Sequence, residues 1–240
     1  MLEQSFGSFE NIIVLDTETT GIDCRKDEII ELAALRAERG NGGFLVKDEF
    51  DLLIHLSSKK KLPQFITELT GISEGMLLEE GVSKENACMR LYEMLSCENP
   101  LVVAYNAQFD LCFLYYFLNH FEKADVLKKV KMLDALTVYK DRRPYPHKLC
   151  NAVEAYSLTV QNTHRAIDDA RATLELLQEM EKERDDLERY INLFGFNPKY
   201  GVSGPRISSV HYAPQPYFMQ STLYESRKTA DGTEINETVF

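Results

Sequence analysis

The chain has 240 residues, of which 44% are hydrophobic and 27% are charged, and its formal net charge is −11 at pH 7. This length suits one sizeable core with an appendage rather than two comparable domains. The acidic charge argues against a protein that holds nucleic acid mainly through a basic face. It does not exclude a nuclease, because divalent cations bound by carboxylates can become the local positive charge that meets a phosphate.

No stretch approaches the roughly 18 to 20 apolar residues of a membrane span, and the N-terminus lacks the basic start and apolar run of a signal peptide. We therefore expect a globular cytoplasmic protein that does not associate with a membrane. The five cysteines form no Cys-x-x-Cys pair, which argues against a zinc cage or a full disulfide framework. We expect reduced, mostly buried thiols.

The first third of the chain predicts a buried strand and then an ambiguous segment. Residues 11–15 are short, apolar and rich in β-branched side chains, which is typical of a buried strand. Residues 28–39 predict a helix by propensity. A glycine-rich turn at residues 40–43 and an apolar stretch at residues 44–56 leave open a hairpin, in which packing would override that propensity.

The middle of the chain predicts helices around a second short strand. Pro63 suits a first helical turn, Gly71 ends that helix, and Ser83 suits the cap of the next helix, which runs to about Cys97. The further expected elements are a strand at 101–104, a buried helix at 107–121, and shorter helices at 133–140 and 147–156.

The strongest helical pattern starts near Thr163 and is expected to extend to about Phe194. After Gly195 the chain becomes rich in glycine, proline and aromatic residues, and it ends in a polar segment. We therefore predict a domain at residues 8–194 and a C-terminal tail at residues 195–240 that wraps the core or stays mobile. Because strands and helices intermix, the predicted fold class is α/β, a central sheet with helices on both faces.

Two carboxylates lie at the end of the first predicted strand. Asp16 and Glu18 are two residues apart, so the alternation of a strand points both side chains to one face. Such a pair repels itself unless a proton or a metal intervenes, and an oxygen-preferring cation such as Mg²⁺ or Mn²⁺ suits it. The alternative is a solvated turn, because these residue types also favour turns.

A third carboxylate follows the second predicted strand. Asp110 lies at another transition from strand to helix, and strand ends meet in the crevice where open α/β sheets usually bind ligands. The alternative is that Asn106 caps the helix and that Asp110 merely complements the helix dipole.

His164 and Asp169 open the long predicted helix. Five residues at about 100° each would place them roughly 140° apart, so a shared target requires His164 to lie in the loop or the first turn. A mobile neutral histidine suits a base that takes a proton from water, while Asp169 on the helix suits a fixed metal ligand. The alternative is an exposed histidine beside an aspartate that the helix dipole favours.

Three segments, in this order, resemble the signature of the DEDDh exonucleases, the DnaQ-like family that includes the proofreading epsilon subunit of bacterial DNA polymerase III. Residues 14–21 read Val-Leu-Asp-Thr-Glu-Thr-Thr-Gly, residues 106–110 read Asn-Ala-Gln-Phe-Asp, and residues 164–170 read His-Arg-Ala-Ile-Asp-Asp-Ala. The resemblance spans roughly residues 10 to 185. It implies a ribonuclease H-like fold with a mixed central sheet and a 3′ to 5′ exonuclease that releases nucleoside 5′-monophosphates.

The resemblance implies two divalent cations, Mg²⁺ or Mn²⁺, and makes four carboxylates their ligands: Asp16, Glu18, Asp110 and Asp169. His164 becomes the general base. The family places its last aspartate five residues after the histidine, which selects Asp169 over Asp168.

The resemblance also implies where the terminal nucleotide binds. The expected contacts are Thr19, Thr20, Gly21, Ile22, Asn106 and Phe109, with apolar surfaces that tolerate any base. Tyr105 stands where several relatives have histidine, which concerns nucleotide binding rather than the chemistry.

The expected substrate is single-stranded or frayed DNA, in proofreading or repair. RNA trimming by the same fold and an inactive interaction module are the alternatives, because nothing in the sequence reads a 2′-hydroxyl. A polymerase and a sliding clamp are candidate partners, the clamp because residues 220–224, Gln-Ser-Thr-Leu-Tyr, resemble clamp-docking peptides. A basic stretch could touch a phosphate backbone or could be a solvated loop: Lys140, Arg142, Arg143 and Lys148.

Overall fold

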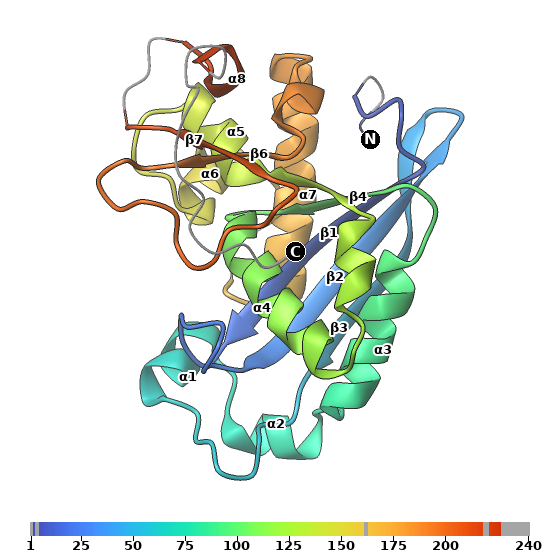
Figure 1. Ribbon diagram of the computed structural model, residues 1–240, viewed down its shortest axis with the longest axis vertical. Helices are drawn as coiled ribbons and strands as arrows, with labels where there is room; N and C mark the ends of the chain where they lie inside the picture. Colours follow the sequence, from blue (N-terminus) through green and yellow to red (C-terminus); the bar gives the residue numbers. More distant parts are fainter. Residues whose placement is uncertain (1, 3–4, 161–162, 218–220, 227–240) are drawn as a thin grey trace.

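The computed structural model describes residue 2 and residues 5–160, 163–217 and 221–226. In these residues a five-stranded sheet has the order β3-β2-β1-β4-β5, and a second sheet pairs β6 with β7. Figure 1 shows both sheets. The strands are β1 (Asn11–Thr19), β2 (Ile29–Gly40), β3 (Gly43–Leu53), β4 (Pro100–Ala104), β5 (Lys131–Asp134), β6 (Leu193–Phe196) and β7 (His211–Pro214).

The large sheet is mixed. β1 pairs antiparallel with β2, and β2 pairs antiparallel with β3. On its other edge β1 pairs parallel with β4, which pairs parallel with β5. Since β1, β4 and β5 run in the same direction, their carboxyl ends meet at one edge of the sheet, where ligand sites of α/β folds usually lie. The mixed central sheet expected from the sequence is confirmed.

Helices cover both faces of this sheet. None of the helices in the described ranges is long and apolar enough to cross a membrane. They are α1 (Gln64–Thr70), α2 (Glu74–Glu79), α3 (Lys84–Leu95), α4 (Ala107–His120), α5 (Ala135–Arg142), α6 (Leu149–Ala155), α7 (Ala166–Glu183) and α8 (Leu223–Ser226), with the 3₁₀ turns η1 (Ala124–Lys128) and η2 (Leu187–Tyr190).

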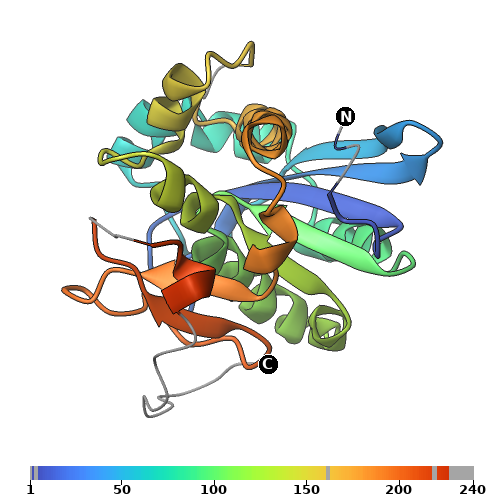
Figure 2. The ribbon, with the colours of Figure 1, turned by 90° about the horizontal axis from the view of Figure 1, so that it is seen from above.

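The alternation of strand side chains divides the core into two clusters. Ile13 and Leu15 of β1 pack in one cluster with the buried residues of α3 and α4. Ile12 and Val14 point to the other face and pack with α7. Figure 2 shows α7 nearly end-on, on the opposite side of the sheet from α4. The apolar parts of β1 and β4 are buried on both faces, so they read as continuous apolar runs.

The helix predicted by propensity at residues 28–39 is wrong, and the alternative of a hairpin is confirmed, because this segment forms β2 and pairs antiparallel with β3. Helix propensity is a weak preference that tertiary packing overrides. Leu32 and Ala34 pack in the cluster with α4, while Leu35 and Ala37 pack in the cluster with α7, so the segment fills both cores. The turn to β3 contains Gly43 with a φ of 99°, a conformation that glycine adopts without steric cost.

Two further boundaries differ from the prediction. The segment expected to be helical from residue 133 begins as β5, and α5 starts only at Ala135, where the Asp134 side chain accepts the hydrogen bond of the Leu136 N–H. The predicted helix from residue 163 to about 194 starts at Ala166 and ends at Glu183. Beyond it the chain forms η2 and then β6, which pairs parallel with β7.

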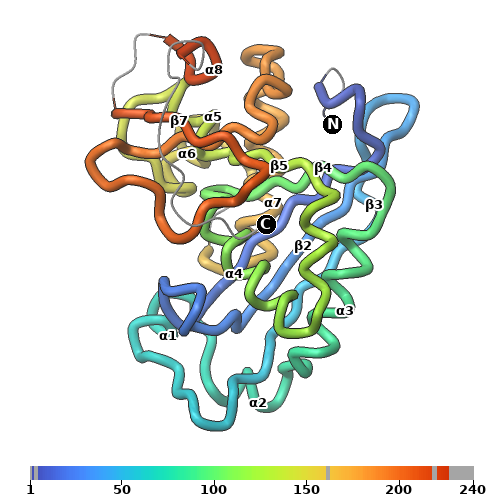
Figure 3. The backbone as a smooth tube through the Cα atoms, in the orientation of Figure 1, coloured from blue at the N-terminus to red at the C-terminus, as the bar shows by residue number. Residues whose placement is uncertain are grey.

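Residues 195–217, at the start of the predicted tail, lie against the core. Gln108 of α4 donates hydrogen bonds to the carbonyl oxygens of Ser203, at 2.9 Å, and Pro205, at 2.7 Å. The Tyr212 hydroxyl donates to Gln108 Oε1 at 2.5 Å. The tube in Figure 3 shows this segment beside α4 and α5.

Candidate active site

Asp16 and Glu18 lie on one face of β1 near its carboxyl end. Their side chains are half-buried, whereas Thr17 between them is buried on the other side, as strand alternation requires. The register of the sheet places Glu18 opposite Glu31 of β2. The local sequence therefore brings two carboxylates to one place, and the sheet adds a third beside them.

Asp110 comes to this strand end from the first turn of α4. It is 2% exposed, and the Thr17 hydroxyl donates a hydrogen bond to its Oδ1 at 2.7 Å. Asn106 occupies the N-cap position of α4 with a φ of 68°, yet its side chain makes no capping hydrogen bond. Asp134 Oδ1 instead accepts from the backbone N–H of Asn106, at 2.9 Å, and of Ala107, at 3.1 Å. The capping role considered for the Asn106 side chain is therefore performed by Asp134.

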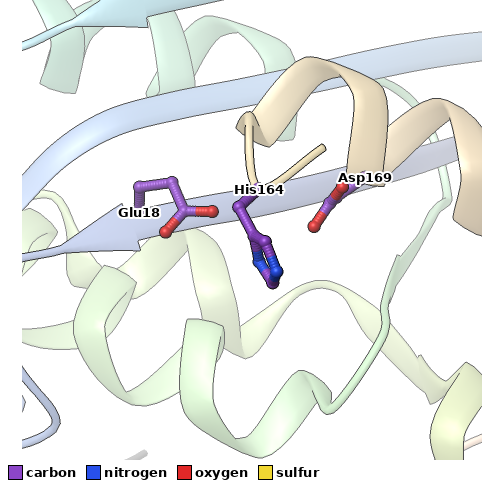
Figure 4. Close-up of side chains that lie close together, drawn as sticks. All are labelled: Glu18, His164 and Asp169. Carbon is purple, nitrogen blue, oxygen red and sulfur yellow. The ribbon is translucent and has the colours of Figure 1, made fainter. Parts of the chain in front are cut away.

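The start of α7 brings the last two candidates to β1. Oxygen and nitrogen atoms of Glu18, His164 and Asp169 all lie within 4.8 Å of one another. Figure 4 shows the three side chains converging from the strand, from the loop before α7 and from α7 itself. His164 is exposed and precedes the helix with a φ of 57°, so it lies in the loop, as a shared target with Asp169 required.

Asp168, the aspartate beside Asp169, points elsewhere. Its Oδ2 accepts a hydrogen bond from the Thr163 hydroxyl at 2.7 Å, and its Oδ1 lies 3.9 Å from Arg171. It does not belong to the group formed by Glu18, His164 and Asp169. The choice of Asp169 over Asp168 is consistent with this geometry.

Glu31 holds the start of α7 and was not singled out by the sequence. Its side chain is fully buried, and its Oε1 lies 2.7 Å from Arg165 Nε and 2.5 Å from Arg165 Nη2. Its Oε2 accepts from the Ala166 N–H at 2.8 Å. Its segment, residues 28–39, has helical propensity, which gives no reason to place Glu31 near the site. Pairing of this segment as a strand with residues 11–19 is what places Glu31 opposite Glu18. Glu31 thus fixes the backbone next to His164.

The electrostatics of the group are those of crowded, buried carboxylates. Burial raises the pKa of Glu18 to about 8, with further repulsion from Asp169, Glu31 and Asp110. Burial and the same kind of repulsion raise the pKa of Asp16 well above its usual value. Burial also raises the pKa of Asp110 to about 7, although the hydrogen bond from Thr17 opposes the rise. Groups perturbed in this way mark functional sites.

A divalent cation fits this donor set. Carboxylate oxygens are the ligands that Mg²⁺ and Mn²⁺ prefer, and a cation would remove the repulsion that raises these pKa values. The resemblance to the DEDDh exonucleases implies ions of this kind. The residues that could hold such ions are Asp16, Glu18, Asp110 and Asp169, and His164 offers a further nitrogen.

Of the residues expected to bind the terminal nucleotide, four lie at the end of β1 and in the loop that follows it: Thr19, Thr20, Gly21 and Ile22. Thr19 donates its hydroxyl hydrogen bond to the Gly21 carbonyl at 2.6 Å. Gly21 packs so tightly on Asp27 that an added Cβ would lie 2.4 Å from a carboxylate oxygen. Ile22 is 88% exposed. Phe109, on α4, is half-buried and packs on Phe113 with ring centroids 4.9 Å apart.

Thr20 helps to hold the same loop. Its hydroxyl donates to Asp27 Oδ1 at 3.3 Å and accepts from the Glu28 N–H at 3.0 Å. These hydrogen bonds give the loop a defined shape, and the loop exposes the apolar side chain of Ile22.

The predicted basic stretch divides into two pairs. Arg142 lies 2.5 Å from Asp186, and Arg143 lies 2.8 Å from Glu183, so their charges are already compensated. Neither lysine of the stretch forms an ion pair with a carboxylate in the described parts of the chain. Of the four basic side chains, these two lysines have charges that remain uncompensated.

Comparison with known proteins places this geometry in a family. Residues 13–177 match the model of the RNase T family, described as exonuclease. PolC-type DNA polymerase III of Thermotoga petrophila is 35% identical over 172 residues, 70% of this chain, and that of Clostridium perfringens is 32% identical over 180 residues, 73% of this chain. The chain spans only 12% and 11% of the lengths of these relatives.

The solved structures show the same fold. An E. coli ExoI–ssDNA complex, in a zinc-bound form, superposes with a TM-score of 0.67 at 16% identity, over 76% of this chain and 42% of that one. The predicted ribonuclease H-like fold is confirmed, and so is the resemblance to DnaQ-like exonucleases. Since the family model covers more than half of the sequence, the chain belongs to the RNase T exonuclease family.

Proposed function

We propose that the chain is a metal-dependent 3′ to 5′ exonuclease that removes nucleoside 5′-monophosphates from single-stranded or frayed ends of DNA. The observation that carries this proposal is the convergence of Glu18, His164 and Asp169 within 4.8 Å at the end of β1, inside the matched family region. The fully buried Glu31 behind them holds the loop and the helix that supply two of the three.

The carboxylates of Asp16, Glu18, Asp110 and Asp169 would hold two divalent cations, Mg²⁺ or Mn²⁺. Bound there, such cations supply charge stabilisation of the phosphate and lower the pKa of bound water. His164 takes a proton from the attacking water, for which its exposed position outside the helix suits it. The apolar side chain of Ile22, and that of Phe109, offer stacking surfaces for the terminal base.

The substrate is proposed to be DNA because the relatives are DNA polymerases and the superposed structure holds single-stranded DNA. Residues 8–194 form the exonuclease domain in this proposal, and residues 195–240 form a C-terminal segment, of which residues 195–217 lie against the domain. The proposed setting is cytoplasmic proofreading or repair, with a DNA polymerase as partner.

A sliding clamp fits the structure less well as a partner. Gln220, at the start of the peptide that resembles a docking motif, lies outside the described residues. Leu223 is fully buried, and the Tyr224 hydroxyl donates to Asp186 at 3.1 Å. Docking would require both side chains to leave the core. A peptide of residues 218–240 that shows no saturable binding to a clamp would remove this partner.

The test is degradation of 5′-labelled single-stranded DNA and matched RNA in Mg²⁺, Mn²⁺ or EDTA. We expect a metal-dependent ladder that shortens from the 3′ end, faster with DNA. Asp169→Asn should abolish the ladder, whereas Asp168→Asn, one residue away but outside the group, should keep it. Faster loss of RNA would assign the chain to RNA trimming. No ladder from folded, metal-loaded protein would leave an inactive interaction module.

A further inference from the structure

A pocket of about 330 Å³ lies between residues 136–148 and residues 197–217. Of the four exposed tyrosine and phenylalanine side chains in the described residues, three line it: Tyr145, Tyr200 and Tyr217, which are 63%, 68% and 42% exposed. Aromatic side chains are usually largely buried, so three exposed rings that line one pocket indicate a binding surface. We call this hollow the tyrosine pocket.

The tyrosine pocket is positive in an acidic protein. Lys140 and Lys148 line it, and its described lining contains no aspartate or glutamate, although the net charge of the chain is −11. No carboxylate of the described residues lies within ion-pair distance of either lysine, whereas the neighbouring Arg142 and Arg143 are compensated. The pocket therefore has two cations available to an anionic ligand.

Ring contacts hold the pocket in shape. Tyr145 and Tyr217 have centroids 5.1 Å apart, and His147 stacks on Tyr217 at 6.2 Å with an interplanar angle of 22°. His147 Nε2 lies 2.9 Å from the Arg143 carbonyl oxygen, so this nitrogen carries the proton and donates. A preformed aromatic surface loses little conformational entropy when a flat ligand stacks on it.

The pocket is also tied to the candidate active site. The Tyr105 hydroxyl donates to the His147 carbonyl oxygen at 2.9 Å, and Tyr105 immediately precedes the N-cap of α4, the helix that carries Asp110. This hydrogen bond joins the backbone of a residue that lines the pocket to the residue that precedes the N-cap of α4.

We infer that the tyrosine pocket binds single-stranded DNA upstream of its 3′ terminus, by stacking bases on the tyrosines and by placing phosphates near Lys140 and Lys148. Proteins bind single strands without sequence preference through this combination of aromatic platforms and positive charge. An aromatic groove also suits a proline-rich peptide, but that ligand needs no cations. The inference rests on the proposed exonuclease function.

The first experiment measures binding without chemistry. A fluorescent oligonucleotide of about 12 nucleotides is titrated with the full chain in EDTA, which removes divalent cations so that binding is measured without hydrolysis. Tyr145→Ala and Tyr200→Ala should each raise the Kd roughly fivefold or more, given that tenfold corresponds to about 1.4 kcal/mol. Tyr145→Phe should restore the affinity, because the ring remains.

The matched control is Phe65→Ala. Phe65 is 59% exposed on α1 and does not line the tyrosine pocket, so its loss should leave the Kd unchanged. Circular dichroism of each variant checks that the fold is kept. Photocrosslinking with 5-iododeoxyuridine placed at successive positions should label Tyr145 or Tyr200 from an internal position and not from the 3′ terminus.

The second experiment separates this site from the catalytic centre. A nitrophenyl ester of thymidine 5′-monophosphate has one base and cannot reach both sites. The Tyr145→Ala variant should therefore hydrolyse this ester like wild type. With the oligonucleotide as substrate, the KM of the variant should rise and its kcat should stay unchanged. Unchanged oligonucleotide Kd and KM in both alanine variants would overturn the inference. If the wild-type chain hydrolysed neither substrate, the proposed function would be refuted. The Kd values measured in EDTA would still test whether the tyrosine pocket binds DNA.

Discussion

Glu18→Gln should stabilise the metal-free protein while it weakens the metal site. Burial raises the pKa of Glu18 from 4.5 to about 8, so its ionisation opposes folding. One pKa unit corresponds to about 1.4 kcal/mol, which sets the cost at up to about 5 kcal/mol. Because the side chain is half-buried and water screens its charge, we expect about 2 to 3 kcal/mol.

The stability difference between wild type and Glu18→Gln should depend on pH, because the pKa of Glu18 is raised in the folded state. The folded-state pKa is above the unfolded one, so the stabilising contribution of the protonated group is full below 4.5 and is lost as the pH rises to about 8. Wild type and Glu18→Gln should therefore differ little at about pH 5, and the variant should be more stable at about pH 9. For a chain of this size the difference corresponds to a rise in Tm of roughly 5 to 10 °C.

The assay is thermal unfolding in EDTA at both pH values, repeated with saturating Mn²⁺. The metal should raise the Tm of wild type more than that of the variant, because one ligand is missing. Glu79→Gln, an exposed glutamate on α2, is the control and should change neither value. A Glu18→Gln protein no more stable than wild type at about pH 9 in EDTA would refute the electrostatic reasoning.

Three further changes test the surroundings of the site. Glu31→Gln removes the ion-pair partner of Arg165. We expect the free energy of unfolding in urea to fall by about 2 to 3 kcal/mol and kcat to fall at saturating metal. An unchanged kcat would show that the contacts of Glu31 with Arg165 and Ala166 do not position the site. Thr17→Val removes a hydrogen bond that lowers the pKa of Asp110, so this pKa should rise further above about 7. Activity should therefore fall more at neutral than at alkaline pH. Parallel pH–rate profiles of wild type and variant would contradict this. Asp134→Ala removes the side-chain caps of α4 and α5 and should cost about 2 to 3 kcal/mol of stability; a loss under about 0.5 kcal/mol would argue against the capping role.

Local spacing made the candidate site predictable. Strand alternation places Asp16 and Glu18 on one face whatever the rest of the chain does. Helical geometry requires His164 to lie outside the helix of Asp169 if the two residues share a target. These relations depend on neighbours within a few residues. The structure also brings Glu18 together with His164 and Asp169. The resemblance to the DEDDh exonucleases implied this convergence, which local spacing does not specify.

Features that depend on distant partners could not be read from such spacing. Residues 29–40 have helical propensity, yet they form β2 because their side chains fill cores on both faces of the sheet. The role of Glu31 follows from that strand, since only the pairing with β1 and the approach of α7 place it under Arg165.

The sequence by itself determined which carboxylates and which histidine lie at the ends of which elements, because periodicity is a property of the local chain. Only the tertiary structure showed that α7 ends at Glu183 and that residues 193–196 beyond it pair with residues 211–214. It also gathered Tyr145, Tyr200 and Tyr217, which are up to 72 residues apart in the numbering, into one pocket. Long-range contacts of this kind are selected by packing over the whole fold, and local propensity carries no record of them.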